Sequence, residues 1–197
     1  MRVTCCILAD VDSLFNCRAL RIQQPGELLA NRARYEIFDD QRRLVAVASE
    51  TEAHTRLKVL AKSMPDARVL SITTAGNEPV LTLVKHARDR ITELLDPLGE
   101  PAGTIQAMQT NRYYMLLDHQ DQTVGRVAGD LALKHFSVTG SEDREFARIR
   151  KTWAGFKEML TTADHYQVEF TAPVSPPART LTVVMAIVLD LTVYGPV

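Results

Sequence analysis

Several features that mark other protein classes are scarce in this chain of 197 residues. Its three cysteines, Cys5, Cys6 and Cys17, crowd one end in an odd number, which does not make a disulfide framework. The five histidines show no zinc-site spacing relative to them. A formal net charge of -1 gives no general electrostatic reason to bind nucleic acid. We therefore expect no metal, no cofactor and no nucleic-acid partner.

Catalytic and targeting signatures are also missing. The sequence contains no nucleophile elbow, no glycine-rich phosphate loop and no HExxH zinc motif, so we expect no catalytic residues and no enzymatic activity. The apolar stretch near residues 1–10 is too short for a signal peptide, and acids follow it at once. We therefore expect a cytoplasmic location.

One apolar run does stand out, at residues 181–189, followed by Asp190. It is too short for a transmembrane helix, which needs about 20 apolar residues. As a helix it would have no polar face, and such a helix must be buried in protein. Its β-branched residues instead favour a buried strand. The residues alone leave helix and strand open, but in either case the rest of the chain must enclose this run.

Most of the chain reads as short apolar strands separated by turns rich in Asp, Gly, Asn and Pro, which is the pattern of β-hairpins. The turn centres recur about every 21 residues between positions 77 and 140, a spacing that favours an up-and-down sheet. The five expected strand pairs are 35–38 with 44–48, 69–73 with 80–84, 91–94 with 103–108, 113–117 with 123–128, and 136–139 with 145–150.

Two segments show helical spacing of apolar residues instead. Residues 49–64 begin with Ser49 and Glu52, a capping-box pattern, and end before Pro65. A shorter stripe covers residues 153–163. The proline-rich stretch at 172–177 predicts an extended crossing into the terminal run.

A family resemblance emerges in the last third of the chain. Residues 147–153 read Ala-x-Ile-x-Lys-x-Trp, a glycine follows, and residues 164–170 read Asp-x-Tyr-x-Val-x-Phe. This order resembles the phospholipid scramblase and LURP-one-related proteins, which also close with an apolar helix carrying an acid near its end, as Asp190 does here. The Tyr35-x-Ile37-x-Asp39 segment and the hairpin at 117–125 fit as well. The resemblance covers about residues 20–194.

The resemblance implies a mainly β, Tubby-like fold, in which a closed antiparallel β-barrel of about twelve strands surrounds a hydrophobic C-terminal helix. It favours the helix for the terminal run, and it implies a single barrel domain at 20–197 after an N-terminal extension at 1–19. We expect the helix to be almost fully buried, with a hydrogen-bond donor for the acid at its end. Its core residues would be Leu181, Val184, Met185, Ile187, Val188, Leu189 and Asp190.

Scramblases carry a proposed calcium segment with acids at its first, third and twelfth positions. The matching residues here are Thr162, Asp164 and Pro173, so one carboxylate remains. Calcium takes six to eight oxygen ligands, several of them charged. We therefore expect no calcium site. The family's proline-rich N-terminal tail and acylated cysteine cluster are missing too, which weighs against calcium-driven scrambling.

Clusters of basic residues are the candidate lipid-binding groups. We assign this role to Arg32, Arg34, Arg42, Arg43, Arg148, Arg150 and Lys151, and a further cluster is Lys85, His86, Arg88 and Arg90. On a barrel, some of them could meet on an anionic headgroup, or they could form an ordinary solvated face interleaved with acids.

Together with the resemblance, these clusters predict a scramblase-like, LURP-one-related protein that binds lipid. We expect it to be a peripheral membrane protein that binds anionic phospholipid at the inner face of the plasma membrane. The alternative is a soluble scaffold or signalling module whose barrel binds a protein partner. The lack of net positive charge favours that alternative.

Overall fold

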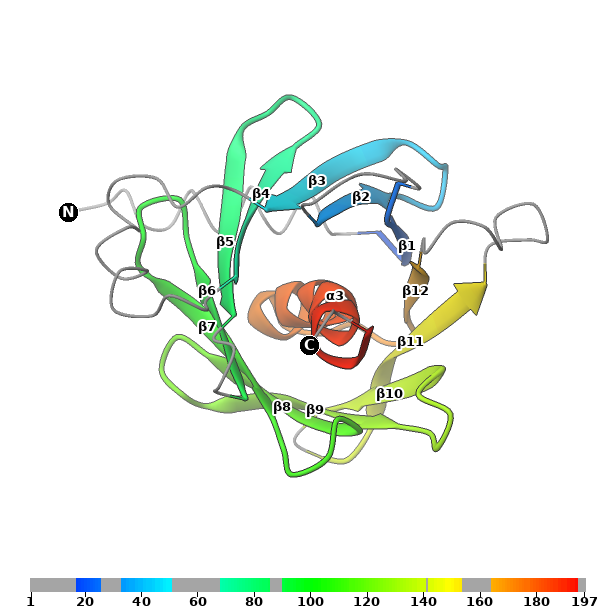
Figure 1. Cartoon of the computed structure of the whole chain (residues 1–197). Coiled ribbons are helices and arrows are strands. Elements are labelled where there is room, and N and C mark those ends of the chain that lie inside the picture. Colours follow the sequence, from blue (N-terminus) through cyan, green and yellow to red (C-terminus); the bar gives the residue numbers. More distant parts are fainter. Residues whose placement is uncertain are drawn as a thin grey trace.

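A computed structural model describes residues 17–25, 33–50, 68–85, 90–140, 142–153 and 164–194. Twelve antiparallel strands close into a barrel, and one helix, α3, runs through its interior (Figure 1). The predicted fold class is confirmed. The strands are β1 (Ala19–Gln23), β2 (Arg34–Phe38), β3 (Leu44–Glu50), β4 (Arg68–Thr74), β5 (Pro79–Lys85), β6 (Ile91–Leu95), β7 (Pro101–Ala107), β8 (Tyr113–Asp118), β9 (Thr123–Gly129), β10 (His135–Thr139), β11 (Glu145–Trp153) and β12 (Asp164–Phe170).

Each strand pairs with its neighbours in sequence, and the barrel closes where β1 pairs with β12. Ala19 lies opposite Glu169 and Gln23 opposite His165 in that pair. Closure leaves no unpaired sheet edge. Side chains alternate between the interior and the outer face along each strand, as the burial of Leu20 and Ile22 around the exposed Arg21 shows.

The five predicted hairpins are all present, and their turns share one design. Each contains a residue with positive φ: Arg42, Asn77, Gly99, Asp121 or Asp143. In three of the turns an aspartate carboxylate, from Asp39, Asp96 or Asp118, accepts two backbone N–H groups of the same turn. These local hydrogen bonds explain why Asp and Gly clusters predicted the turns well.

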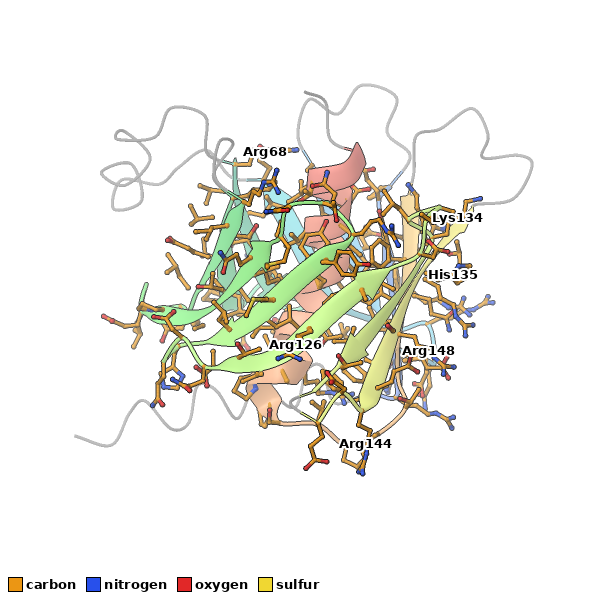
Figure 2. All side chains as sticks on the ribbon, turned by 90° about the horizontal axis from the view of Figure 1, so that it is seen from below. Arg68, Arg126, Lys134, His135, Arg144 and Arg148 are labelled. Carbon is orange, nitrogen blue, oxygen red and sulfur yellow. The ribbon has the colours of Figure 1, made fainter. Side chains whose placement is uncertain are left out.

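The barrel has two distinct ends. The five hairpin turns lie at the end where β12 passes into α3, which we call the entry end, and α3 finishes at the opposite or exit end. In the side view, Arg68 and Lys134 lie near the exit end, whereas Arg144 lies at the entry end (Figure 2).

Helix α3 (Pro176–Leu189) continues into a π-helical turn, η2 (Asp190–Tyr194). The expected helix is therefore confirmed, and each of its residues from Leu181 to Leu189 is buried. The extended crossing is shorter than the predicted 172–177, because Pro176 and Pro177 form the first helical turn. Proline is tolerated there, since the first helical N–H groups have no partner within the helix.

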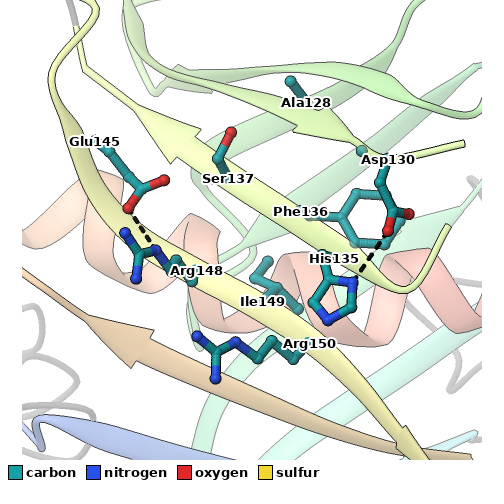
Figure 3. Close-up of a pocket in the computed structure, with 10 residues that line it drawn as sticks. Ala128, Asp130, His135, Phe136, Ser137, Glu145, Arg148, Ile149 and Arg150 are labelled. Atoms are coloured by element: carbon teal, nitrogen blue, oxygen red, sulfur yellow. Dashed lines mark hydrogen bonds and ion pairs between the residues drawn. The ribbon is translucent and has the colours of Figure 1, made fainter.

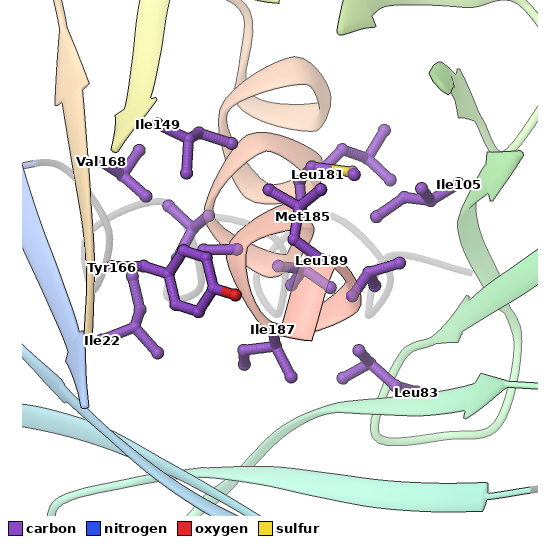
Figure 4. Packing of buried hydrophobic residues seen from close by; sticks show 14 of the residues in the cluster. Ile22, Leu83, Ile105, Ile149, Tyr166, Val168, Leu181, Met185, Ile187 and Leu189 are labelled. Atoms are coloured by element: carbon purple, nitrogen blue, oxygen red, sulfur yellow. The ribbon is translucent and has the colours of Figure 1, made fainter. Parts of the chain in front are cut away.

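The core lies between the helix and the inner faces of the strands. Ile22, Leu83, Ile105, Ile149, Tyr166 and Val168 point from the wall toward Leu181, Met185, Ile187 and Leu189 of α3 (Figure 4). The helix lies close to β7 at Gly103, where an added Cβ would lie 2.8 Å from the Leu117 carbonyl oxygen and 3.2 Å from a Leu181 methyl carbon. A strand residue without a side chain is therefore needed to seat the helix.

The polar groups of the helix have partners inside the barrel. The Thr182 hydroxyl donates to the Ala178 carbonyl oxygen at 2.6 Å. Asp190, only 7% exposed, accepts hydrogen bonds from the hydroxyls of Tyr35 at 2.6 Å and Tyr166 at 3.4 Å. The predicted donor for this acid is confirmed, and it comes from two strands on either side of β1.

The helix expected at 49–64 does not begin at Ser49. Ser49 cannot cap a helix at 49–64, because it lies in β3 and pairs with both Arg34 and Ser71. The other expected helix, at 153–163, overlaps β11 at Trp153. The remaining parts of both, together with residues 1–16 and their two cysteines, lie outside the described residues.

Candidate functional site

The predicted lipid-binding residues do not form one cluster. Arg34 lies at the exit end of β2, 3.4 Å from Glu36. Arg42 and Arg43 lie in the turn at the other end of the same strand, and Arg43 forms a 2.7 Å ion pair with Asp39. The four steps from Arg34 to the end of β2 at Phe38, about 13 Å of backbone, separate the two groups. Arg32 lies outside the described residues.

The other three predicted residues, Arg148, Arg150 and Lys151, lie on β11, where successive side chains point to opposite faces of the sheet. Arg148 and Arg150 are exposed on the outer face. Lys151 points to the other side, with its Nζ 5.9 Å from the ring centre of the buried Tyr166. Of the predicted set, the structure therefore brings together Arg148 and Arg150.

These two arginines border a hollow of about 420 Å³ on the outer face of β9, β10 and β11 (Figure 3). Phe136 and Ile149 contribute to its lining, and the polar residues around it are Asp130, His135, Ser137, Glu145, Arg148 and Arg150. The hollow is thus a shallow open site with three basic and two acidic side chains.

Both acids of the hollow are already engaged. Glu145 forms a 2.6 Å ion pair with Arg148. Asp130 lies 3.0 Å from the Nδ1 atom of His135, and this hydrogen bond lowers the pKa of Asp130 despite the opposing effect of desolvation. No hydrogen bond or ion pair to another described residue engages the exposed Arg150. Its guanidinium is therefore available to an external anion.

Strand register places three residues that the sequence analysis did not select in one row with Arg150. His135 on β10 pairs with Arg150 on β11, Arg150 pairs with Gln167 on β12, and Gln167 pairs with Arg21 on β1. We call His135, Arg150, Gln167 and Arg21 the basic row. Adjacent strands are about 4.8 Å apart, so Arg21 lies roughly 10 Å from Arg150 along the row. Arg21 is exposed and, like Arg150, has no charged partner within the described part of the chain.

The predicted cluster at residues 85–90 does not extend this row. Lys85 is half-buried in β5, and desolvation, followed by the nearby Arg68, lowers its pKa. Arg90 lies at the exit end, where it donates to the Met108 carbonyl oxygen. His86 and Arg88 lie outside the described residues.

The described part of the segment that matches the scramblase calcium region is extended, and Thr162 lies outside the described residues. Asp164 begins β12 at the exit end, whereas Pro173 lies beyond the opposite end of this strand. Seven extended residues span about 20 Å, too far for the two ends of the segment to share one ion. Nowhere in the described ranges do three or more His, Cys, Asp or Glu residues come together as metal ligands.

Comparison with known proteins now decides the family. The scramblase family model matches residues 29–195. The chain belongs to the scramblase family. The predicted resemblance is thereby confirmed, and the match includes the strands that carry Arg148 and Arg150 as well as the buried helix.

A solved structure shares the fold of this scramblase-family protein. An X-ray structure of a protein from Arabidopsis thaliana aligns with a TM-score of 0.54 at 12% identity, covering 90% of this chain and 92% of that one. A structure of S. aureus TarM in complex with fondaparinux, α-GlcNAc-glycerol and UDP aligns at a TM-score of 0.20 and 10% identity over 74% of this chain and 24% of that one, which is too weak to support any argument. No curated protein matches the sequence.

Membrane crossing by a helix has no support in the described segments of this family member. None of their helices is long and apolar enough to span a bilayer. Helix α3, which has the most apolar sequence, is enclosed by the barrel.

Proposed function

We propose that this scramblase-family protein is a peripheral lipid-binding module that binds anionic phospholipid headgroups at the hollow and along the basic row. The observation that carries the proposal is Arg150, an exposed guanidinium with no acid partner among the described residues, beside His135 and Arg148 in the shallow hollow. Family membership supports a lipid-associated role in general, and the hollow is the location that we propose for it.

The chemistry of the row suits a phosphate group. A guanidinium can donate two parallel hydrogen bonds to phosphate oxygens, and such charge-assisted bonds are stronger than neutral ones. Each basic residue close to an anionic leaflet contributes about 1 kcal/mol of attraction. Neither Arg150 nor Arg21 has an ion pair with another described residue that binding would break, and the Gln167 amide between them offers a further donor.

Calcium is not needed for this mode of binding, because the cations of the protein contact the phosphate directly. The extended shape of the segment from Asp164 to Pro173 also argues against a calcium-gated mechanism there. We therefore propose calcium-independent binding, at the inner face of the plasma membrane, where anionic lipids are enriched.

Co-sedimentation with vesicles tests the proposal. The protein should bind phosphatidylcholine vesicles that contain phosphatidylserine, should not bind phosphatidylcholine alone, and should behave equally with calcium and with EDTA. Arg150→Gln should weaken binding several-fold. Arg126→Gln is the matched control, since Arg126 is also exposed on the barrel but pairs with Asp143 at 3.1 Å. Equal losses in both variants would show that no specific site exists.

A protein-binding scaffold is the second candidate function, and the net charge of -1 favours it. A stoichiometric partner captured through the barrel, together with no vesicle binding, would support this alternative over the lipid-binding module.

A further inference from the structure

Three large apolar side chains are exposed together at the exit end of the barrel. Leu131 is 87% exposed, Tyr113 46% and Met108 41%. Met108 and Tyr113 flank the turn between β7 and β8, and Leu131 lies in the turn between β9 and β10. We call these three residues the exit rim.

The two turns are directly connected. The Gly129 N–H donates to the Arg112 carbonyl oxygen at 2.7 Å, and the Arg112 Nε donates back to the Gly129 carbonyl oxygen at 3.3 Å. The Arg112 guanidinium also lies 5.5 Å from the ring centre of Tyr113. The exit rim is therefore one continuous surface across β7 to β10.

The turn that carries Leu131 is held in a defined shape. The Asp130 carboxylate accepts the Lys134 N–H at 2.8 Å and contacts the His135 ring at 3.0 Å. The Leu133 N–H donates to the Asp130 carbonyl oxygen at 3.2 Å. These bonds fix the turn while its apolar tip, Leu131, remains in solvent.

Basic residues lie close to the exit rim. Arg112, Lys134 and His135 come from the two turns or the start of β10, and Arg90, just before β6, donates to the Met108 carbonyl oxygen. The one acid of the β9–β10 turn, Asp130, is engaged by His135. Apolar and aromatic side chains flanked by cations are the composition of segments that lie in the interface of anionic bilayers. Charge complementarity thus favours an anionic bilayer as the binding partner of the exit rim.

The exit rim also adjoins the hollow, because Asp130 and His135 belong to both. We propose that the exit rim inserts into the headgroup region of an anionic bilayer, with Leu131 deepest, so that the exit end of the barrel faces the membrane. This inference rests on the proposed lipid-binding function and adds the orientation and the inserting residues. In this arrangement the hollow lies beside the inserted tip, at the depth of the phosphates.

The entry end supplies a matched control. Leu98 is 64% exposed in the turn between β6 and β7, but its neighbours Asp96 and Glu100 are acidic. An anionic bilayer would repel that turn. Leu98 and Leu131 are thus two exposed leucines in hairpin turns at opposite ends, and both can be replaced without disturbing the core.

Two measurements on phosphatidylserine-containing vesicles test the proposal. Leu131→Ser should weaken vesicle binding on the order of tenfold, the effect of withdrawing one leucine side chain from an apolar environment, and Leu98→Ser should leave binding unchanged. The tryptophan fluorescence of the Leu131→Trp variant should be quenched by lipids with brominated acyl chains more strongly than that of Leu98→Trp. Both variants keep the native Trp153, so its contribution to the fluorescence is the same in each.

The outcomes separate the two proposals. If the wild type binds vesicles but Leu131→Ser binds equally well and the two tryptophan variants are quenched alike, the exit rim is not the inserting surface, and the lipid-binding function stands. If the wild type does not bind vesicles at all, the lipid-binding function fails and the exit-rim proposal fails with it.

Discussion

The Tyr35 hydroxyl lies 2.6 Å from the Asp190 carboxylate, which joins β2 to the end of the central helix across 155 residues of sequence. Tyr166 on β12 reaches the other carboxylate oxygen at 3.4 Å. A buried carboxylate is costly unless it is hydrogen-bonded, so the pair fixes how far the helix extends through the barrel. The position of α3 is thus specified by polar contacts as well as by packing.

Tyr35→Phe should destabilise the protein by about 1.5–3 kcal/mol, because it removes a hydrogen bond to a buried charged group. Tyr114→Phe is the matched control, since Tyr114 is equally buried but its hydroxyl donates to a neutral acceptor, the Asn111 carbonyl oxygen, at 3.1 Å. Tyr114→Phe should lower the free energy of unfolding by less, about 0.5–1.5 kcal/mol. Urea denaturation measures both free energies of unfolding, and a smaller loss for Tyr35→Phe would contradict the role given to this pair.

The same contact predicts a dependence on alkaline pH. Burial, followed by the negative Asp190, raises the pKa of Tyr35 above its ordinary value. The unfolded chain releases this proton above pH ~10 while the folded protein keeps it, so this contribution to stability is complete below pH ~10 and falls above it. The stability advantage of the wild type over Tyr35→Phe should then shrink by about 1.4 kcal/mol per pH unit. Chemical denaturation at several pH values from 8 to 11 measures this difference. A difference that stays constant over that range would contradict the prediction.

Gly103→Ala should destabilise the barrel by about 1–3 kcal/mol, the usual effect of overpacking, since the new Cβ would lie 2.8 Å from the Leu117 carbonyl oxygen. Gly76→Ala is the control, because its new Cβ would be 3.5 Å from the nearest atom, the Thr74 hydroxyl oxygen. Thermal melts of both variants test the close packing of β7 at Gly103 against β8 and α3. Similar melting temperatures would argue against it.

Arg21→Gln should weaken binding to phosphatidylserine vesicles about as much as Arg150→Gln does, because the register places both residues in the basic row. Added salt should weaken wild-type binding as well, since the Debye length is about 8 Å at physiological ionic strength. Vesicle sedimentation at low and high salt measures both effects. If Arg21→Gln matched the wild type while Arg150→Gln did not, the site would be confined to the hollow.

Much of the fold could be predicted from local signals. The hairpins were predictable because aspartates such as Asp39 and Asp118 bind their own turns, a preference that needs no tertiary contact. The terminal run could not be assigned from its residues, because a fully apolar, β-branched segment satisfies both a buried helix and a buried strand. Only the resemblance favoured the helix. The helix predicted to start at Ser49 was wrong at that residue, because Ser49 lies in β3. The pairing of β3 with β2 and β4 overrides the local capping pattern.

The site was less predictable, because it depends on register. Spacing along β11 predicts that Arg148 and Arg150 share a face, and it also separates them from Lys151. The resemblance implied a closed barrel but not the register in which β1 pairs with β12, and without that register Arg21 cannot be placed beside Arg150. The grouping of Arg34 with Arg42 and Arg43 failed to form one patch because a hairpin strand separates them.

The most direct test of lipid binding at the basic row is the dissociation constant for phosphatidylserine-containing vesicles, compared between the wild type, Arg150→Glu and Arg126→Glu. Charge reversal at Arg150 places an acid beside Glu145 and Asp130 in the hollow, so binding should fall at least tenfold, with unchanged thermal stability, while Arg126→Glu retains most of it. Equal affinities of Arg150→Glu and the wild type would contradict the account.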